Sequence, residues 1–262
     1  MQISELFIYP VKSCAGVAVD ELIFDRDGPI GDRRFVITDL AGDFVTQRET
    51  PKMAHILPVL TESSLQLSFG PDTSPLVTLP ITGEDSRVRV WGDEVAGIDC
   101  GDDMAHWLSQ LLEKECRLKA LPEDNMRRAD TKYAPDNVGV SYADGFPLLV
   151  INQASLDILS RESGVDVVAA RFRPNVVVTG AGEAFAERSW TRLSGEGGEL
   201  LVVKPCERCV IPLRDPETLE RTKEVQQALV AHCRIEGKII FGQNAVFDGE
   251  SLSVGMTLSA VV

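Results

Sequence analysis

The feature that most constrains the fold of this chain is a series of short apolar or alternating segments separated by turn residues. The segments include "ISELFIYPV" at residues 3–11, "GVAVDELIFD" at 16–25, "SSLQLSFG" at 63–70, "LVTLPI" at 76–81 and "RVRVWGDEVAGIDCG" at 87–101. Short strands with turns every eight to twelve residues are typical of a barrel or a sandwich. Within "DRRFVITDLAGDFVTQRE" at residues 32–49, the runs 34–38 and 43–47 are joined by "DLAG", which predicts a hairpin.

The hydrophobic period changes to that of a helix only a few times. Residues 102–116 place Trp107, Leu108 and Leu111 on one face, and residues 152–164 run from a candidate cap, Asn152, to a stop at Gly164. Residues 166–172 and 222–232 are two further helical stretches.

The rest of the second half reads as strands, at residues 146–151, 173–180, 198–206, 209–213, 238–248 and 251–262. Residues 121–137 are polar and predict a loop, a lid or a linker, between two halves. Because strands and helices do not alternate regularly, a doubly wound parallel sheet is not expected, and the fold class predicted is mainly β with some α, an α+β fold.

Composition and motifs exclude several classes of function. A net charge of −14 argues against binding to nucleic acid and to an anionic membrane surface. No targeting segment precedes residue 3 and no apolar run could span a bilayer, so a cytoplasmic protein is expected. The glycine-rich fingerprints of dinucleotide and ATP sites are missing.

Two cysteines lie three residues apart in "KPCERCVIPL", Cys206 and Cys209, with Glu207 and Arg208 between them. A closed zinc site would need further paired ligands, and the three histidines are scattered singly. A buried structural pair, a redox dithiol and a single thiolate ligand for a soft metal remain as alternatives. No histidine is near in sequence, which disfavours a Cys–His nucleophile.

Basic and polar residues occur repeatedly where a predicted element ends beside Gly, Pro or Ser. They are Lys12 and Ser13 in "YPVKSC", Arg33 and Arg34 in "GPIGDRRF", Arg171, Arg173 and Asn175 in "RFRPN", and Arg208 between the two thiols. Loops at strand ends commonly carry binding groups, and the guanidinium fork suits a phosphate or the edge of a heterocycle. Surface ion pairs are the alternative explanation for any one of them.

In this order, "LFIYPVKSC", "DRRFVITDLAGDFVTQRE", "FRPNVVV", "CERC…DPETL" and "FGQNAVF" resemble the MOSC-domain molybdenum proteins, in particular the amidoxime-reducing component group and its bacterial relatives. The resemblance implies an N-terminal β-barrel-like domain at residues 1–120 and a MOSC β-barrel domain at 121–262. It implies a molybdenum–molybdopterin cofactor between them, with Cys209 as the protein ligand of the metal and Cys206 not bound to it.

The resemblance also implies which residues contact the cofactor. They are Lys12, Ser13, Arg33, Gly145, Phe146, Arg173, Asn175, Glu207, Arg208 and Asn244. At Gly145, Phe146, Glu207 and Asn244 the residue type departs from, or varies among, better-known members. Asp215 is a candidate for proton delivery, with a turn before Pro216 as the alternative.

The activity implied is the two-electron reduction of N-hydroxylated compounds such as amidoximes, hydroxylamines and N-hydroxylated bases. The chain has no cysteine-rich tail for an iron–sulfur cluster, so a separate electron donor is expected, a ferredoxin, a flavoprotein or a cytochrome. A carrier of the molybdenum cofactor and a sulfur-transfer protein are the alternatives.

Overall fold

The computed structural model describes residues 1–125 and 127–262. Its elements, in chain order, are β1 (Gln2–Ile8), β2 (Val17–Val19), β3 (Glu21–Asp25), β4 (Gly28–Pro29), β5 (Phe35–Thr38), η1 (Pro51–His55), β6 (Leu57–Leu60), β7 (Ser64–Phe69), β8 (Asp72–Thr73), β9 (Val77–Thr78), β10 (Asp85–Val90), β11 (Asp93–Asp99), α1 (Asp102–Leu112), β12 (Arg117–Ala120), β13 (Leu148–Asn152), α2 (Gln153–Ser163), η2 (Ala169–Arg171), β14 (Val176–Thr179), η3 (Ala186–Ser189), β15 (Arg192–Gly195), β16 (Gly198–Glu207), η4 (Ile211–Leu213), α3 (Lys223–Cys233), β17 (Arg234–Ile235), β18 (Lys238–Gly249), β19 (Ser251–Ser253) and β20 (Leu258–Val261). The predicted α+β class, rich in strands, is confirmed.

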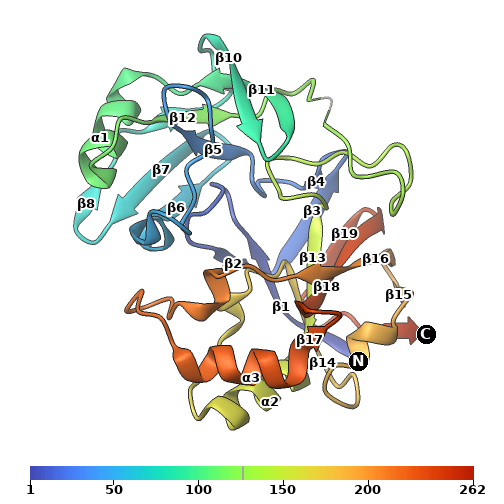
Figure 1. Cartoon of the computed structure of the whole chain (residues 1–262). Coiled ribbons are helices and arrows are strands. Elements are labelled where there is room, and N and C mark those ends of the chain that lie inside the picture. The colour runs from blue at the N-terminus through green and yellow to red at the C-terminus, as the bar shows by residue number, and fades with distance from the viewer. Residues whose placement is uncertain (126) are drawn as a thin grey trace.

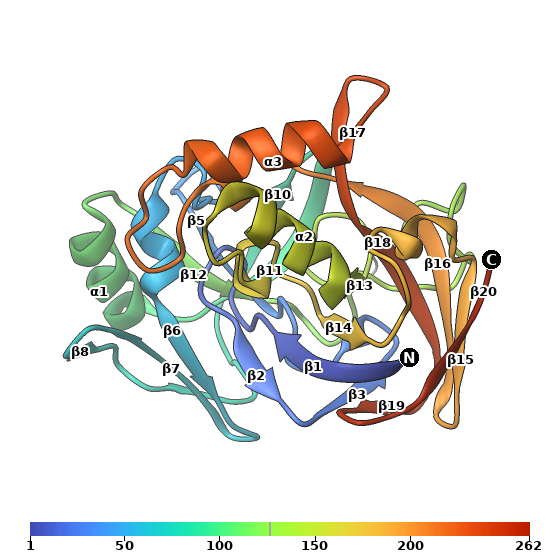
Figure 2. The ribbon, with the colours of Figure 1, turned by 90° about the horizontal axis from the view of Figure 1, so that it is seen from below.

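The strands form two groups that meet along the middle of the molecule (Figure 1). The upper group contains the sheet β10-β11-β12-β5, the small sheet around β7 and helix α1. The lower group is built on a sheet ordered β2-β1-β14-β13-β18-β16-β15-β20, with α2 and α3 packed against it (Figure 2). The first strand of the chain, β1, therefore lies between β2 and β14, a strand from the second half.

Strand β13 shows why the lower sheet is buried on both faces. All five of its residues are buried. Leu148 and Val150 join one apolar cluster, which lies on the face away from the helices, and Leu149 and Ile151 join another with α2 and α3. Alternate side chains of a strand point to opposite faces, so an uninterrupted apolar run is what a sheet covered on both sides requires.

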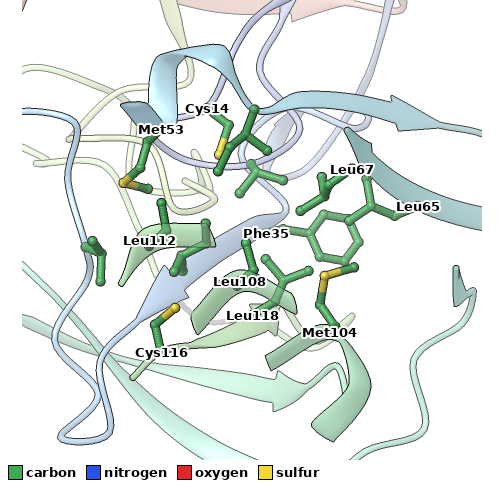
Figure 3. Packing of buried hydrophobic residues seen from close by; sticks show 14 of the residues in the cluster. Cys14, Phe35, Met53, Leu65, Leu67, Met104, Leu108, Leu112, Cys116 and Leu118 are labelled. Atoms are coloured by element: carbon green, nitrogen blue, oxygen red, sulfur yellow. The ribbon is translucent and has the colours of Figure 1, made fainter. Parts of the chain in front are cut away.

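The upper group has its own apolar core, which contacts the loop after β1 (Figure 3). Phe35 of β5, Leu65 and Leu67 of β7 and Leu108 of α1 pack in this core. Cys14 is fully buried among them, and this fixes the short loop that carries Lys12 and Ser13.

The helices predicted at residues 102–116, 152–164 and 222–232 are found as α1, α2 and α3, although α1 ends earlier, at Leu112. The two end residues predicted for α2 are confirmed. The Asn152 side chain accepts a hydrogen bond from the Ala154 N–H, and Gly164 ends α2 with a φ of 67°. The prediction that residues 166–172 are helical is correct only for the single 3₁₀ turn η2. Residues 121–137, which include Met126 outside the described residues, contain no helix or named strand in the part that the structure describes.

Three sequence expectations need correction. Residues 43–47 return beside β5 after the predicted turn but make only isolated bridges, because Asp43 is paired to Arg89 of β10 and the chain then leaves the sheet. The sequence predicts a strand at residues 209–213, but Ile211–Leu213 form the 3₁₀ turn η4 instead. Strands β13 and β14 are parallel and joined through α2, a βαβ unit within an otherwise antiparallel sheet.

Candidate functional site

A cleft lies between the two strand groups, and ten of the twelve residues predicted for the site line it. They are Lys12, Ser13, Arg33, Phe146, Arg173, Asn175, Glu207, Arg208, Cys209 and Asn244. These residues come from six separate parts of the chain. The fold thus gathers the cationic and thiol groups that the sequence keeps far apart.

The loop after β1 supplies the first wall of the cleft. The Lys12 ammonium is buried, donates to the Tyr142 carbonyl at 2.8 Å and forms an ion pair with Asp144 at 2.5 Å. Burial lowers the pKa of Lys12, and the Asp144 carboxylate opposes that shift. Ser13 has a φ of 68°, a region that residues with a side chain seldom adopt.

Two arginines on this side of the cleft lie over the same aromatic ring. The guanidinium of Arg33 lies 4.5 Å from the centre of the Tyr9 ring, and that of Arg173 lies 4.2 Å from it. Both arginines have positive φ, 48° and 57° respectively. Left-handed backbone at non-glycine residues is concentrated at functional sites, where the surrounding packing enforces it.

The two guanidinium groups differ in how their charge is balanced. Arg33 donates to Asp32 at 2.5 Å; burial alone would lower the pKa of Arg33, but this carboxylate raises it above its ordinary value. Burial lowers the pKa of Arg173 to about 10, and its Nη1 donates to the Cys14 carbonyl. Arg173 is therefore a buried cation with no carboxylate bound to it in the part of the chain that the structure describes.

Asn175 holds this corner of the cleft together. Its Nδ2 donates to the Phe7 carbonyl and to Asp32 Oδ1, both at 3.1 Å. Its Oδ1 accepts from Arg33 at 3.0 Å and from the Leu149 N–H at 3.2 Å. The amide is thus occupied by protein partners, and its contribution is to position Arg33.

The thiol pair forms the opposite wall. Strand β16 ends at Glu207, whose carboxylate is paired with Lys238 at 2.7 Å. Cys209 is exposed, and the Ile211 N–H lies 3.5 Å from its sulfur. The Arg208 guanidinium points to the other thiol, with Nη1 3.0 Å from the sulfur of Cys206.

Cys209 differs from the buried cysteines in its availability for chemistry. Burial raises the pKa of the Cys14 thiol to about 12, which keeps that sulfur protonated at neutral pH. Cys209, in contrast, faces the cleft and solvent. Cys206 also lines the cleft but is only partly exposed, so Cys209 is the more accessible thiol of the pair.

Two predicted residues do not line the cleft. Gly145 lies between the lining residues Asp144 and Phe146 without lining it itself. Asp215 lies in a neighbouring cavity, where its carboxylate accepts hydrogen bonds from backbone N–H groups and from Arg171 at 2.7 Å. Those backbone hydrogen bonds, together with Arg171, lower the pKa of Asp215, so it is ionised at neutral pH and serves to fix its turn.

Sequence reasoning missed several polar or aromatic residues of the cleft, among them Gln47, Arg48, Trp91 and Asp144. Trp91 donates to Asp144 at 3.1 Å, and the Arg48 guanidinium stacks over the Trp91 ring at 4.4 Å. The signals available were the "TQRE" that follows the hairpin and the "WG" at the turn between β10 and β11. Neither has a spacing that identifies a site.

Several donors of the cleft have no protein partner. Gln47 Nε2, Arg48 Nε and Arg208 Nε are buried without a hydrogen bond in the described part of the chain. Buried polar atoms in native proteins are almost always hydrogen-bonded, so a polar ligand is expected here. The described residues contain no cluster of three His, Cys, Asp or Glu side chains able to hold a metal, so a metal at Cys209 would need ligands from a cofactor.

Comparison with protein families agrees with this geometry. Residues 1–115 match the MOSC N-terminal beta barrel domain and residues 137–259 match the MOSC domain. The mitochondrial amidoxime-reducing component 1 of Mus musculus is 32% identical over 94% of this chain and 76% of its own length.

This chain belongs to the MOSC-domain family.

Two further relatives show the breadth of the family. The mitochondrial amidoxime reducing component 2 of Homo sapiens is 33% identical over 82% of this chain and 67% of its own. The molybdenum cofactor sulfurase of Danio rerio is 31% identical over 92% of this chain but only 31% of its own. Across residues 1–125 and 127–262, no helix has the length and apolar character to cross a bilayer. The cytoplasmic location stays a prediction.

Proposed function

We propose that this chain is a molybdenum-cofactor-dependent reductase of N-hydroxylated compounds: amidoximes, hydroxylamines and N-hydroxylated bases. One observation carries the proposal: an accessible thiol, Cys209, lies in a cleft whose other walls present Lys12, Arg33 and Arg173. A soft metal takes a thiolate, and a pterin phosphate takes buried cations. The relatives named as amidoxime-reducing components support the reaction class.

The residues present fit the molybdenum–molybdopterin cofactor. Cys209 would supply the protein sulfur for the metal. Arg173, a buried cation without a carboxylate partner in the described structure, suits an anionic group. The free donors Gln47 Nε2, Arg48 Nε and Arg208 Nε suit the oxygen and nitrogen acceptors of a heterocycle.

We also propose that the boundary between the two domains lies near residue 120, with an N-terminal β-barrel-like domain at residues 1–120 and the MOSC domain at 121–262. Strand β1 crosses this division, because it pairs with β14 in the sheet of the second half.

When bound, the cofactor supplies the two-electron chemistry that removes the oxygen of the N–OH group. The overall change is that an N–OH compound, two electrons and two protons give the N–H compound and water. The protein's contribution is placement. Tyr9 orients Arg33 and Arg173, Asp144 orients Lys12 and Trp91, and Phe146 and Phe172 add apolar surface to the lining of the cleft.

Electrons would come from a separate donor protein, a ferredoxin, a flavoprotein or a cytochrome. The exposure of Cys209 supports this, because a metal held there lies close to the surface.

The proposal is tested with protein purified from a host that makes the cofactor. Reduced methyl viologen replaces the natural donor, and conversion of benzamidoxime to benzamidine is followed by chromatography. We expect turnover in the parent, none in Cys209→Ala, and substantial turnover in Cys206→Ala. Activity that survives Cys209→Ala and disappears in Cys206→Ala would exclude the ligand assignment.

Sulfur transfer or cofactor delivery is the second candidate, favoured by the molybdenum cofactor sulfurase relative and by the accessible Cys209. A sulfur-transfer protein would carry cyanide-releasable sulfur on Cys206 or Cys209. A carrier would pass molybdenum to an apo-enzyme without reducing benzamidoxime. The same preparation can be used for all three assays.

A further inference from the structure

An apolar hollow opens next to the cleft on the outer side of Cys209. The cleft and the hollow share Arg48, Trp91, Arg208 and Cys209 in their walls. The hollow has a volume of about 560 Å³, larger than the cleft's of about 150 Å³. A pocket of that size can take a drug-sized molecule.

The remaining wall of the hollow is mostly hydrocarbon. It is made by Val210, Leu213, Leu229, Val230 and Ile239, with Gln226 as the one further polar residue. Val210, Val230 and Trp91 are between 39% and 50% exposed. Apolar groups left open beside an accessible ligand thiol are suited to cover an apolar part of a small molecule.

The charge of the hollow has one sign. Arg48 and Arg208 are its charged residues, and no carboxylate lines it. Within the described structure, neither arginine forms an ion pair: Arg48 stacks on Trp91, and Arg208 bonds to the Cys206 sulfur and the Phe172 carbonyl. A cation entering the hollow would meet two guanidinium groups, to neither of which a carboxylate is bound in the described structure, beside a low-dielectric wall.

We propose that this hollow is the substrate site, and that it selects an uncharged apolar group, with an aromatic ring as the best occupant, while excluding cations. The inference rests on the proposed reductase function. Val230, Val210 and Trp91 are then specificity-determining residues, and Arg48 sets the charge preference.

The charge preference also bears on product release. An amidoxime is neutral near pH 7. Its reduction uses two electrons and two protons and gives water and an amidine, which is a strong base and takes up one further proton from solvent. The product is thus a cation formed next to Arg48 and Arg208, and like-charge repulsion favours its departure.

Three substrates test the selection in the cofactor-loaded protein with reduced methyl viologen. They are benzamidoxime, acetamidoxime, and benzamidoxime with a para-trimethylammonium group. We expect kcat/KM for benzamidoxime to exceed that for acetamidoxime by about tenfold or more, because acetamidoxime lacks the apolar ring. We expect a difference of similar size from the trimethylammonium analogue, because its charge is repelled by the two arginines. Equal values for the three would overturn the inference.

Val230→Asp and Val254→Asp form a matched pair. Both valines are exposed to a similar degree, 42% and 43%, but only Val230 lines the hollow. Val230→Asp should lower kcat/KM for benzamidoxime and raise it for the cationic analogue, while Val254→Asp should change neither. Arg48→Gln gives a further check when rates are taken per bound molybdenum, because Arg48 lines both the cleft and the hollow. It should narrow the difference in kcat/KM between the neutral and the cationic substrate. If both Val230→Asp and Arg48→Gln leave the ratio of kcat/KM for benzamidoxime to that for the cationic analogue unchanged, the hollow is not the substrate site.

Calorimetric titration of benzamidoxime into the oxidised, cofactor-loaded protein separates this inference from the function itself. Binding weakened by Val230→Asp but not by Val254→Asp supports the hollow even in a protein that does not turn over. Turnover of benzamidoxime with binding insensitive to Val230→Asp would retain the reductase and reject the hollow.

Discussion

Replacement of Asn175 by aspartate tests the hydrogen-bonded corner of the cleft, where all four hydrogen bonds of the Asn175 amide have protein partners. The Asn175 side chain is 1% exposed and uses its amide to donate to Phe7 and Asp32. Asn175→Asp keeps the shape and the acceptor oxygen but removes both donated hydrogen bonds. It also places a second carboxyl group 3.1 Å from the carboxylate of Asp32.

The expected loss of stability follows from these contacts. Two buried acceptors each lose one hydrogen bond, although Asp32 Oδ1 keeps the one from the Tyr9 N–H, and the loss of a buried hydrogen bond costs about 1–3 kcal/mol. Burial and the Asp32 carboxylate raise the pKa of the introduced carboxyl, and the Arg33 guanidinium, 3.0 Å from the retained oxygen, opposes that rise. Each unit of net rise costs about 1.4 kcal/mol at a pH where the group is ionised in the unfolded chain. We expect a total loss of about 3–5 kcal/mol at pH 7.5.

The pH dependence has a definite sign. A group whose pKa is higher in the folded than in the unfolded state stabilises the folded state in its protonated form. The loss in Asn175→Asp should be smallest below the unfolded pKa of about 4 and should grow as pH rises toward the folded value. Once protonated, the introduced carboxyl can also donate one hydrogen bond, to Asp32 or to the Phe7 carbonyl.

Urea unfolding at pH 5.0 and pH 7.5, followed by circular dichroism, measures the effect against the parent at each pH. Asn137→Asp is the control, because Asn137 is exposed and makes no contact with Asp32. A loss below about 1 kcal/mol at pH 7.5, or a loss that shrinks as pH rises, would refute the reasoning.

Three other predictions follow from the core and the cleft. Leu108→Ala, in the fully buried upper core, should lower the free energy of unfolding by about 2–5 kcal/mol in urea, with its exposed neighbour Gln110→Ala as the control. Gly42→Ala should destabilise strongly, because Gly42 has a φ of 88° and a Cβ there would lie 2.6 Å from the Arg87 carbonyl oxygen; Gly92→Ala, where a Cβ meets open space, should not. Arg173→Met should lower the amount of molybdenum kept through dialysis at pH 7.5, because it removes a buried cation to which no carboxylate is bound in the described structure; an Arg173→Met protein that keeps its molybdenum would contradict this assignment.

The elements that the sequence predicts well are those with a local signal. The strands of "ISELFIYPV" and "SSLQLSFG" and the helices at residues 102–116 and 152–164 carry period and cap residues within their own segment. In the segments predicted wrongly, the structure is decided by contacts with distant parts of the chain. Residues 43–47 have a strand composition, but the Asp43–Arg89 pair comes from a distant hairpin. The parallel pairing of β13 with β14 is likewise a long-range choice.

The candidate site likewise contains residues that the sequence indicates and residues that only the folded chain reveals. Lys12, Arg33, Arg173 and Cys209 belong to short motifs, so the sequence indicates them individually. Their meeting in one cleft depends on β1 joining β14, which no single motif encodes. Gln47, Arg48 and Trp91 enter the cleft from two loops of the upper group, one of them just beyond a broken strand pattern, and only the folded chain reveals them.

The most direct test of the central claim, that the Cys209 sulfur holds molybdenum, is molybdenum X-ray absorption on the parent and on Cys209→Ser and Cys206→Ser. We predict near-stoichiometric molybdenum in the parent, with one sulfur ligand that is lost in Cys209→Ser and kept in Cys206→Ser. An identical sulfur shell in the parent and Cys209→Ser, or a parent without molybdenum when purified from a cofactor-producing host, would contradict the account.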